Sequence, residues 1–133
     1  MYDTPLILED FLNYIETIKG KSSNTVAEYQ YDLRTFFRFL KIRYKMVGLD
    51  VEFNDIDISD IEIDTIKKVT LQDLYAFISY VDKERNNKNN AKARKVASLR
   101  SFYKYLHSKI KLIEDNPTPV SYTHLTLPTI LLV

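Results

Sequence analysis

Tyrosine and histidine are the side chains of this sequence that could act as nucleophiles or carry protons. The chain holds ten Tyr and two His among 133 residues, and it has no Cys. The Tyr residues fall on predicted buried stripes, on helix surfaces or in the C-terminal tail, and a buried Tyr is most often a core residue. Tyrosine alone therefore assigns no catalytic site.

The histidines and the acidic residues are equally uninformative about catalysis. His107 lies among three Lys residues near the end of a predicted helix, where a role at the helix end or toward phosphate outweighs catalysis. His124 belongs to the tail. The segment 50–64 is rich in Asp and Glu, but it lacks the Gly and the terminal Glu of a calcium-binding loop. We predict no catalytic residue, no cofactor and no metal site.

Composition places the chain in a broad class. With 19 Lys and Arg against 18 Asp and Glu, the formal net charge is only +1. The absence of Cys excludes disulfide frameworks and thiolate zinc sites. The N-terminus has acidic residues where a signal peptide needs basic ones, and no apolar run reaches the roughly 18 to 20 residues of a membrane span. We therefore expect a soluble, cytoplasmic protein that makes no membrane contact.

Helices are expected almost throughout, because the chain has only two Gly and its apolar residues recur at steps of three and four. The predicted helices cover 5–19, 23–45, 71–85 and 89–112. Gly20 is the expected stop of the first helix and Ser22 the N-cap of the second. Thr70 and Asp73 form a capping-box pattern before the third. The fold class is all-α.

Each predicted helix has an apolar stripe that should face a core. In the first helix the stripe is Leu8, Phe11, Leu12, Ile15 and Ile18. In the second it is Val26, Tyr29, Leu33, Phe36, Phe37, Leu40 and Tyr44. In the third it is Leu71, Leu74, Phe77, Ile78 and Val81. In the fourth it is Val96, Leu99, Phe102, Tyr103, Leu106 and Ile110.

Between the second and third helices, apolar and acidic residues alternate in VEFNDIDISDIEID. Alternation alone is typical of a strand, but a single strand would have no partner in a helical chain. We therefore expect an acidic surface loop across 46–66 with a short helical turn near 64–68. NNKNN, at 86–90, is the expected break before the fourth helix.

Two helices carry a basic outer face. On the second helix it comprises Asn24, Gln30, Tyr31, Arg34, Arg38, Lys41 and Lys45. On the fourth it comprises Arg94, Ala97, Ser98, Ser101, Lys104 and Tyr105, with Arg100 at the edge. Small side chains among cations allow a backbone to approach an anion closely. Such faces suit nucleic acid, since cations neutralise phosphates and polar side chains donate to phosphates and base edges. By pattern alone, a merely solvated face is the commoner case.

A resemblance to a known family changes that balance. SSNTVAEYQYDLRTFFRFL resembles the second helix of the N-terminal core-binding, SAM-like domain of Xer-type tyrosine recombinases. The matching residues are Ser22, Asn24, Thr25, Tyr29, Asp32, Leu33 and Phe36 or Phe37. ARKVASLRSFYKYL and the following NPT resemble the last helix of that domain and the start of its linker. Those residues are Ala93, Arg94, Lys95, Ser98, Leu99, Arg100, Phe102, Tyr103, Leu106, Asn116 and Pro117. The resemblance covers roughly residues 6–118.

The resemblance implies a four-helix domain that forms one jaw of a clamp around duplex DNA, with its second and fourth helices at the major groove. It also implies that a separate C-terminal domain performs DNA strand exchange. There a Tyr attacks a phosphodiester, assisted by two Arg, a Lys and His residues, and a 3′-phosphotyrosyl intermediate forms. Four protomers normally act on two sites. These 133 residues alone should therefore be catalytically inactive.

The tail from Val120 is unlike the rest of the chain. VSYTHLTLPT is encoded by GTC TCT TAT ACA CAT CTG ACG CTG CCG ACG, a string that resembles a transposase end and sequencing adapter. The preceding codon of Pro119 also fits this string. We therefore expect a core-binding domain over 1–118 and a tail over 119–133 that is adapter read-through. The alternatives are a native terminal strand or partner-binding peptide, and a linker into a missing domain.

The sequence thus predicts the DNA-binding N-terminal part of a Xer-like tyrosine recombinase, with duplex DNA and other protomers as partners. The expected DNA contacts are Asn24, Thr25, Gln30, Tyr31, Arg34, Arg38, Lys92, Arg94, Lys95, Ser98, Arg100, Ser101 and Lys104. Arg34 and Arg94 are central to their faces. The alternatives are a helical protein-interaction module or a small stand-alone DNA-binding regulator.

Overall fold

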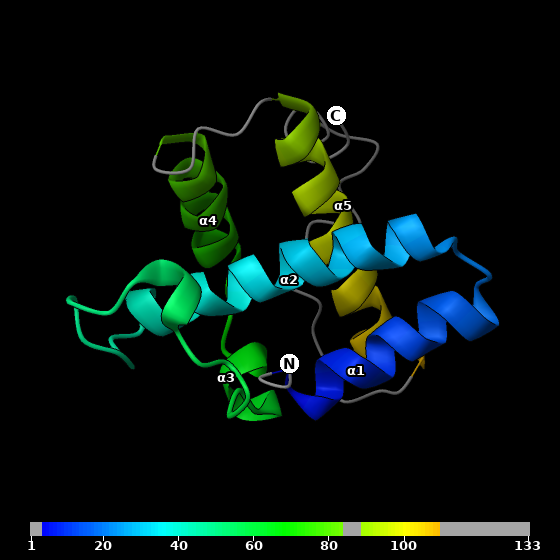
Figure 1. The fold of residues 1–133 in the computed structure, drawn as a ribbon, viewed down its shortest axis with the longest axis horizontal. Helices are drawn as coiled ribbons and strands as arrows, with labels where there is room; N and C mark the ends of the chain where they lie inside the picture. The colour runs from blue at the N-terminus through cyan, green and yellow to red at the C-terminus, as the bar shows by residue number, and fades with distance from the viewer. Residues whose placement is uncertain (1–3, 84–88, 110–133) are drawn as a thin grey trace. The chain divides into compact units, whose positions relative to one another are not determined.

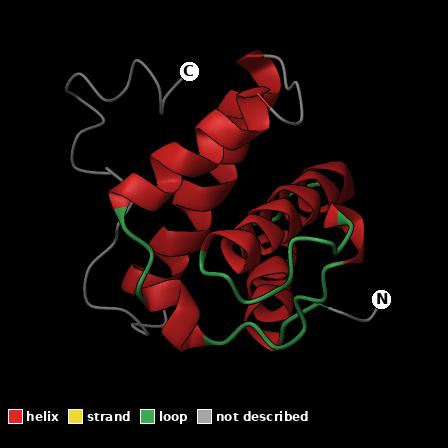
Figure 2. Ribbon diagram, turned by 90° about the vertical axis from the view of Figure 1, so that its left-hand side faces the viewer, coloured by secondary structure: helices red, strands yellow, loops and turns green. Residues whose placement is uncertain are grey.

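The computed structural model describes residues 4–83 and 89–109. Its regular elements in these ranges are helices, and Figure 2 shows no strand in the described part of the chain. This result confirms the all-α fold class. The chain divides into two compact units, 1–66 and 67–133, and each is described by itself below. The tail 119–133 lies outside the described residues.

The first helix ends where the sequence predicts. Helix α1 spans Leu6–Asn13 and continues as one π-helical segment, Tyr14–Ile18. Gly20 follows with a φ of +69°, in the left-handed region that Gly occupies without a side-chain clash. The chain therefore turns at Gly20 and leads directly into the second helix.

Helix α1 buries Leu8, Phe11 and Ile15, as expected, and Leu12 is half-buried. Ile18 was expected inward but is 70% exposed. The π-helical segment explains this difference: the Lys19 amide donates to the Tyr14 carbonyl, five residues back. The wider turn shifts the phase of the side chains that follow, so the three- and four-residue spacing no longer holds.

Helix α2, Ser23–Arg43, is the long helix of the first unit and packs with α1 (Figure 1). The Ser22 hydroxyl accepts a hydrogen bond from the Thr25 amide at 3.2 Å, which confirms the predicted cap. Every residue of the predicted apolar stripe is buried or half-buried, which confirms the stripe. Leu33, Phe36, Phe37 and Leu40 are buried, whereas Val26, Tyr29 and Tyr44 are half-buried.

Aromatic contacts join the two helices of this unit. The rings of Phe11 and Tyr29 stack with centroids 6.4 Å apart and planes within 6° of parallel. Burial raises the pKa of Tyr29, and the nearby carboxylates of Asp32 and Glu28 add to the increase. The hydroxyl of Tyr29 therefore stays protonated at physiological pH, and the residue acts as part of the core.

The second half of α2 is more buried than the apolar stripe predicts. Asp32, Thr35, Phe39 and Lys41 are buried in addition to the stripe. The Thr35 hydroxyl donates to the Tyr31 carbonyl at 2.9 Å, one turn back. Lys41 was expected on the solvated basic face, and this was wrong. Its ammonium group meets a carboxylate of the following loop, as described below.

The segment after α2 is an irregular loop, as predicted. It contains a short 3₁₀ turn at Phe53–Asp55 and the five-residue helix α3, Ile63–Lys67, close to the expected turn at 64–68. The alternation in its sequence has a clear role, since most of the Ile residues between the acidic residues point inward. The buried members are Ile56, Ile58, Ile61 and Ile66. The acidic residues between them face solvent, apart from the contacts given below.

The second unit begins with helix α4, Leu71–Lys83. The Thr70 amide donates to an Asp73 carboxylate oxygen at 2.9 Å, and the Asp73 amide donates to the Thr70 hydroxyl at 3.3 Å. This reciprocal pair confirms the capping box. In the predicted stripe Leu74, Phe77 and Val81 are buried, and Leu71 and Ile78 are half-buried.

The Thr70→Ala variant should lose about 1 kcal/mol of stability, because the amide of Asp73 would lose its acceptor. Urea unfolding followed by circular dichroism measures this loss. Ser79→Ala, an exposed change in the middle of α4, is the matched control and should cost nothing. Equal stabilities for the two variants would show that the capping box is energetically unimportant.

Helix α5, Asn89–Lys104, packs with α4 and continues as a π-helical segment, Tyr105–Lys109. The helix begins at Asn89, as predicted, and residues 86–88 of the expected break lie outside the described residues. The predicted stripe is confirmed in Val96, Leu99, Phe102, Tyr103 and Leu106, which are all buried. Ile110 lies outside the described residues. None of the helices within 4–83 and 89–109 has the length and apolar character of a membrane span.

Candidate nucleic-acid interface

The first half of α2 carries the polar face that the sequence predicts. Asn24 is exposed and Tyr31 is 51% exposed. Thr25, Gln30, Arg34 and Arg38 are half-buried, so each still reaches solvent. We call these six residues the α2 face. All of them except Thr25, which lies in the first turn, follow one side of the helix, and together they combine an aromatic ring with amide, hydroxyl and guanidinium groups.

A contact with the N-terminal segment orients Arg34. Its Nη1 atom donates to the Thr4 hydroxyl at 2.9 Å, and Thr4 lies just before α1. A guanidinium group has five N–H donors, so this bond leaves the side chain able to donate to a second acceptor. The bond also restricts the rotamers of Arg34 before any ligand binds, which lowers the entropy cost of a phosphate contact.

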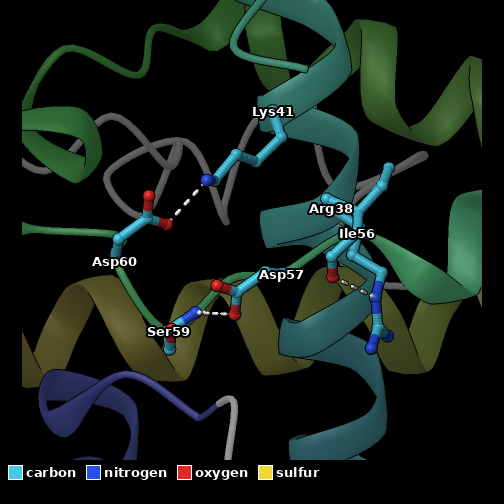
Figure 3. A network of polar contacts seen from close by, with 6 residues as sticks. All are labelled: Arg38, Lys41, Ile56, Asp57, Ser59 and Asp60. Atoms are coloured by element: carbon cyan, nitrogen blue, oxygen red, sulfur yellow. Dashed lines mark hydrogen bonds and ion pairs between the residues drawn. The ribbon is translucent and has the colours of Figure 1, made fainter. Parts of the chain in front are cut away.

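Farther along α2, the cations turn toward the loop of residues 50–64, which we call the acidic loop. Figure 3 shows Arg38 and Lys41 reaching this loop from neighbouring turns of α2. Arg38 Nε donates to the Ile56 carbonyl at 3.2 Å. Lys41 Nζ lies 2.6 Å from the Asp60 carboxylate. Lys41 is only 4% exposed, so this ion pair replaces much of the water around its ammonium group.

A hydrogen bond within the acidic loop stabilises the ionised carboxylate of Asp57. The Ser59 amide donates to Asp57 Oδ1 at 3.0 Å, and this bond lowers the pKa of Asp57, with a smaller contribution from the positive charge of Lys41. Asp57 is exposed. Its carboxylate is therefore ionised at physiological pH and presents a negative charge to solvent beside α2.

In the second unit, α5 presents a smaller basic surface than the sequence suggests. Ala97 and Lys104 are exposed, and Arg94 and Ser101 are half-buried. These four residues are the α5 face. Lys92 lies outside it, since its ammonium group pairs with the Asp82 carboxylate of α4 at 2.8 Å.

Two of the expected contacts on α5, Lys95 and Ser98, are buried. Lys95 is 2% exposed and Ser98 is fully buried, with its hydroxyl donating to the Arg94 carbonyl at 3.1 Å. The predicted place of Ser98 on the outer face was wrong, and Lys95, expected as a DNA contact, is buried as well. Lys95 is four residues before Leu99, and Ser98 is four before Phe102, so both lie beside the buried stripe. Arg100 is half-buried, and its burial lowers its pKa.

Tyr105 also differs from the expectation, because it is 7% exposed rather than outward. It is the first residue of the π-helical segment, where the phase of α5 changes. His107, in the same segment, is exposed. In the part of the chain that the structure describes, no three His, Asp or Glu side chains gather as a possible metal site.

Comparison with known proteins now assigns the family. Residues 8–51, which include most of α1 and all of α2, match the family described as "Phage integrase, N-terminal SAM-like domain". The Tyrosine recombinase XerC of Caldanaerobacter subterraneus subsp. tengcongensis is 58% identical over 114 residues, which are 86% of this chain and 32% of the relative. The chain belongs to the phage integrase family through this N-terminal domain. The resemblance drawn from the two helices is thereby confirmed.

More distant relatives agree with this assignment. The Tyrosine recombinase XerC of Leptospira interrogans serovar copenhageni is 30% identical over 90% of this chain and 31% of its own length. The Tyrosine recombinase XerD of Listeria innocua is 29% identical over 82% of this chain and 31% of its own length. The chain thus spans about a third of the length of these relatives. No solved structure matches it.

Proposed function

We propose that this chain is the DNA-binding N-terminal part of a tyrosine site-specific recombinase, and that the α2 face and the α5 face contact duplex DNA. The observation that carries the proposal is the 58% identity to a tyrosine recombinase over most of this chain. The two faces supply the chemistry, because each combines a cation with small or polar side chains. Both have the residue types that bind phosphates and base edges.

On the α2 face, Arg34 is the proposed phosphate contact. It is half-buried and already oriented by Thr4, so it needs little ordering to bind. Asn24 and Gln30 can donate to phosphates or read base edges, and the exposed ring of Tyr31 offers an apolar surface to sugar or base. The arrangement places one cation among three neutral groups that can read a groove.

On the α5 face, small side chains allow close approach. Ala97 is exposed and Ser101 is half-buried, so neither extends far from the helix. Arg94 and Lys104 flank them within three residues on either side. A DNA backbone can therefore come near the α5 backbone while both cations reach its phosphates.

The activity of the whole protein is part of the same proposal. The full-length enzyme would exchange DNA strands through a 3′-phosphotyrosyl intermediate, with catalytic residues outside these 133 residues. Other protomers would be its protein partners, in a tetramer on two sites, and the cytoplasm its location. Residues 119–133, which we propose not to be part of the native protein, have no role in it.

The test is a fluorescence-anisotropy titration of the chain with a duplex oligonucleotide at several salt concentrations. Arg34→Ala and Arg94→Ala should each weaken binding about tenfold at low salt. Each should also lower the slope of log affinity against log salt by about 0.9, because one phosphate contact is lost. Lys67→Ala and Lys83→Ala are the controls, since each removes an exposed cation that belongs to neither face.

Two outcomes would contradict the proposal. One is an unchanged slope for both arginine variants, which would place the phosphate contacts elsewhere. The other is the absence of salt-dependent DNA binding by the unmodified chain. Competition by an unrelated duplex distinguishes DNA binding from a helical protein-interaction module, because only a DNA-binding surface releases its labelled duplex to such a competitor.

A further inference from the structure

The acidic loop is the most strongly charged segment of the described chain. Its fifteen residues, 50–64, contain seven Asp and Glu and no Lys, Arg or His. The loop is anchored by its buried Ile residues, Ile56, Ile58 and Ile61. The negative charge therefore has a defined position beside α2, instead of being spread over a freely moving segment.

The contacts of Arg38 and Lys41 fix where that charge lies. Arg38 donates to the carbonyl of Ile56, and the residues on either side of Ile56 are Asp55 and Asp57, both exposed. The Asp57 carboxylate lies within electrostatic reach of Lys41, whose positive charge contributes to the lowered pKa of Asp57. Figure 3 shows Asp57 between the Arg38 and Lys41 contacts. Carboxylates of the acidic loop thus accompany the cations at this end of α2.

The later part of the α2 face consequently lies beside negative charge. Arg38, one turn after Arg34, is held by a loop that carries a net negative charge. A phosphate that approaches Arg38 therefore also meets the carboxylates of the acidic loop, which repel it.

We infer that the acidic loop is a border of the DNA interface, and that Arg38 and Lys41 are positioning residues that hold this border rather than phosphate contacts. The duplex backbone would contact α2 only from its N-terminus to Arg34. The inference rests on the proposed function and specifies which part of α2 serves it. Arg38, expected from sequence as a DNA contact, would then act through the loop.

The test neutralises the exposed carboxylates without disturbing the anchors. The triple variant Asp55→Asn, Asp57→Asn, Glu62→Gln keeps Asp60, so the Lys41 contact remains, and an Asn at 57 can still accept from the Ser59 amide. The matched control is Glu9→Gln, Asp10→Asn, Glu16→Gln, which removes three exposed carboxylates from α1 and its π-helical segment. Both variants change the net charge by the same amount.

We expect the loop variant to bind duplex DNA at least about threefold more tightly than the α1 control at low salt, with a difference that shrinks as salt rises. Arg38→Gln should leave the salt slope unchanged, in contrast to Arg34→Ala. Thermal unfolding monitors that each variant is folded. Equal affinities of the loop and α1 variants, or a slope reduced by about 0.9 in Arg38→Gln, would overturn the inference.

Failure of the inference is distinguishable from failure of the proposed function. If the unmodified chain binds duplex DNA and loses affinity in Arg34→Ala, the proposed function stands. Equal DNA affinities of the loop variant and the α1 control would then refute only the inference that the acidic loop borders the interface. If neither the unmodified chain nor any variant binds DNA in a salt-dependent way, the proposed function is overturned and the border with it.

Discussion

Leu33→Ala should lower the free energy of unfolding by about 3 kcal/mol and the melting temperature by roughly 10 °C. Leu33 is fully buried in the middle of α2, beside the Phe36 and Phe37 rings in the helical register. Those two rings lie 6.0 Å apart with their planes tilted by 47°. The substitution removes apolar surface from the core and leaves a cavity that the two neighbouring rings fill poorly.

The chain supplies a matched control for this prediction. Leu49 is 95% exposed, so Leu49→Ala makes the same chemical change with almost no loss of burial. It should alter stability by less than about 0.5 kcal/mol. Differential scanning calorimetry of both variants provides the comparison. Similar melting temperatures for Leu33→Ala and Leu49→Ala would show that Leu33 is not in a tightly packed core.

The second large effect is expected at the ion pair between α2 and the acidic loop. Asp60→Asn should cost about 2 kcal/mol, because the ammonium group of Lys41 stays buried while the carboxylate that it contacts loses its charge. The Asp60 side chain is 65% exposed, so water can partly replace it. For that reason the expected cost lies below the range for fully buried pairs.

Lys41→Met should cost less than Asp60→Asn, because Met retains most of the packed aliphatic stem and no longer carries a charge into the core. The double variant should be about as stable as Lys41→Met alone. Urea unfolding of the four proteins forms a double-mutant cycle that measures the coupling. Additive losses in the double variant would show that the 2.6 Å contact contributes nothing to stability.

Several features of the fold could be predicted from local sequence, because their causes are local. The Ser22 cap and the capping box of Thr70 and Asp73 are local, because each side-chain oxygen accepts a hydrogen bond from an amide only three residues away. Gly20 ends the first helix because Gly adopts positive φ without strain. The apolar spacing likewise identified the buried centres of α2 and α5.

Errors arose where the helical period changes or where a second surface covers an outer face. The π-helical segments shifted Ile18 outward and Tyr105 inward, and no local residue preference signals such a change. For Lys95 a signal was present, since its four-residue spacing to Leu99 places it next to the core. The charge of Lys95 favours an exposed position, but its spacing to Leu99 places it beside the core.

The sequence by itself determined the helical class, the helix ends, most of the core and the family, because these follow from spacing and from residues that match at fixed positions. The tertiary structure alone decided the extent of the basic surface. Arg38 and Lys41 look equivalent to Arg34 on a helical wheel, yet a loop some 20 residues later in the chain contacts both. The distribution of charge along α2 depends on that long-range contact, which no local pattern encodes.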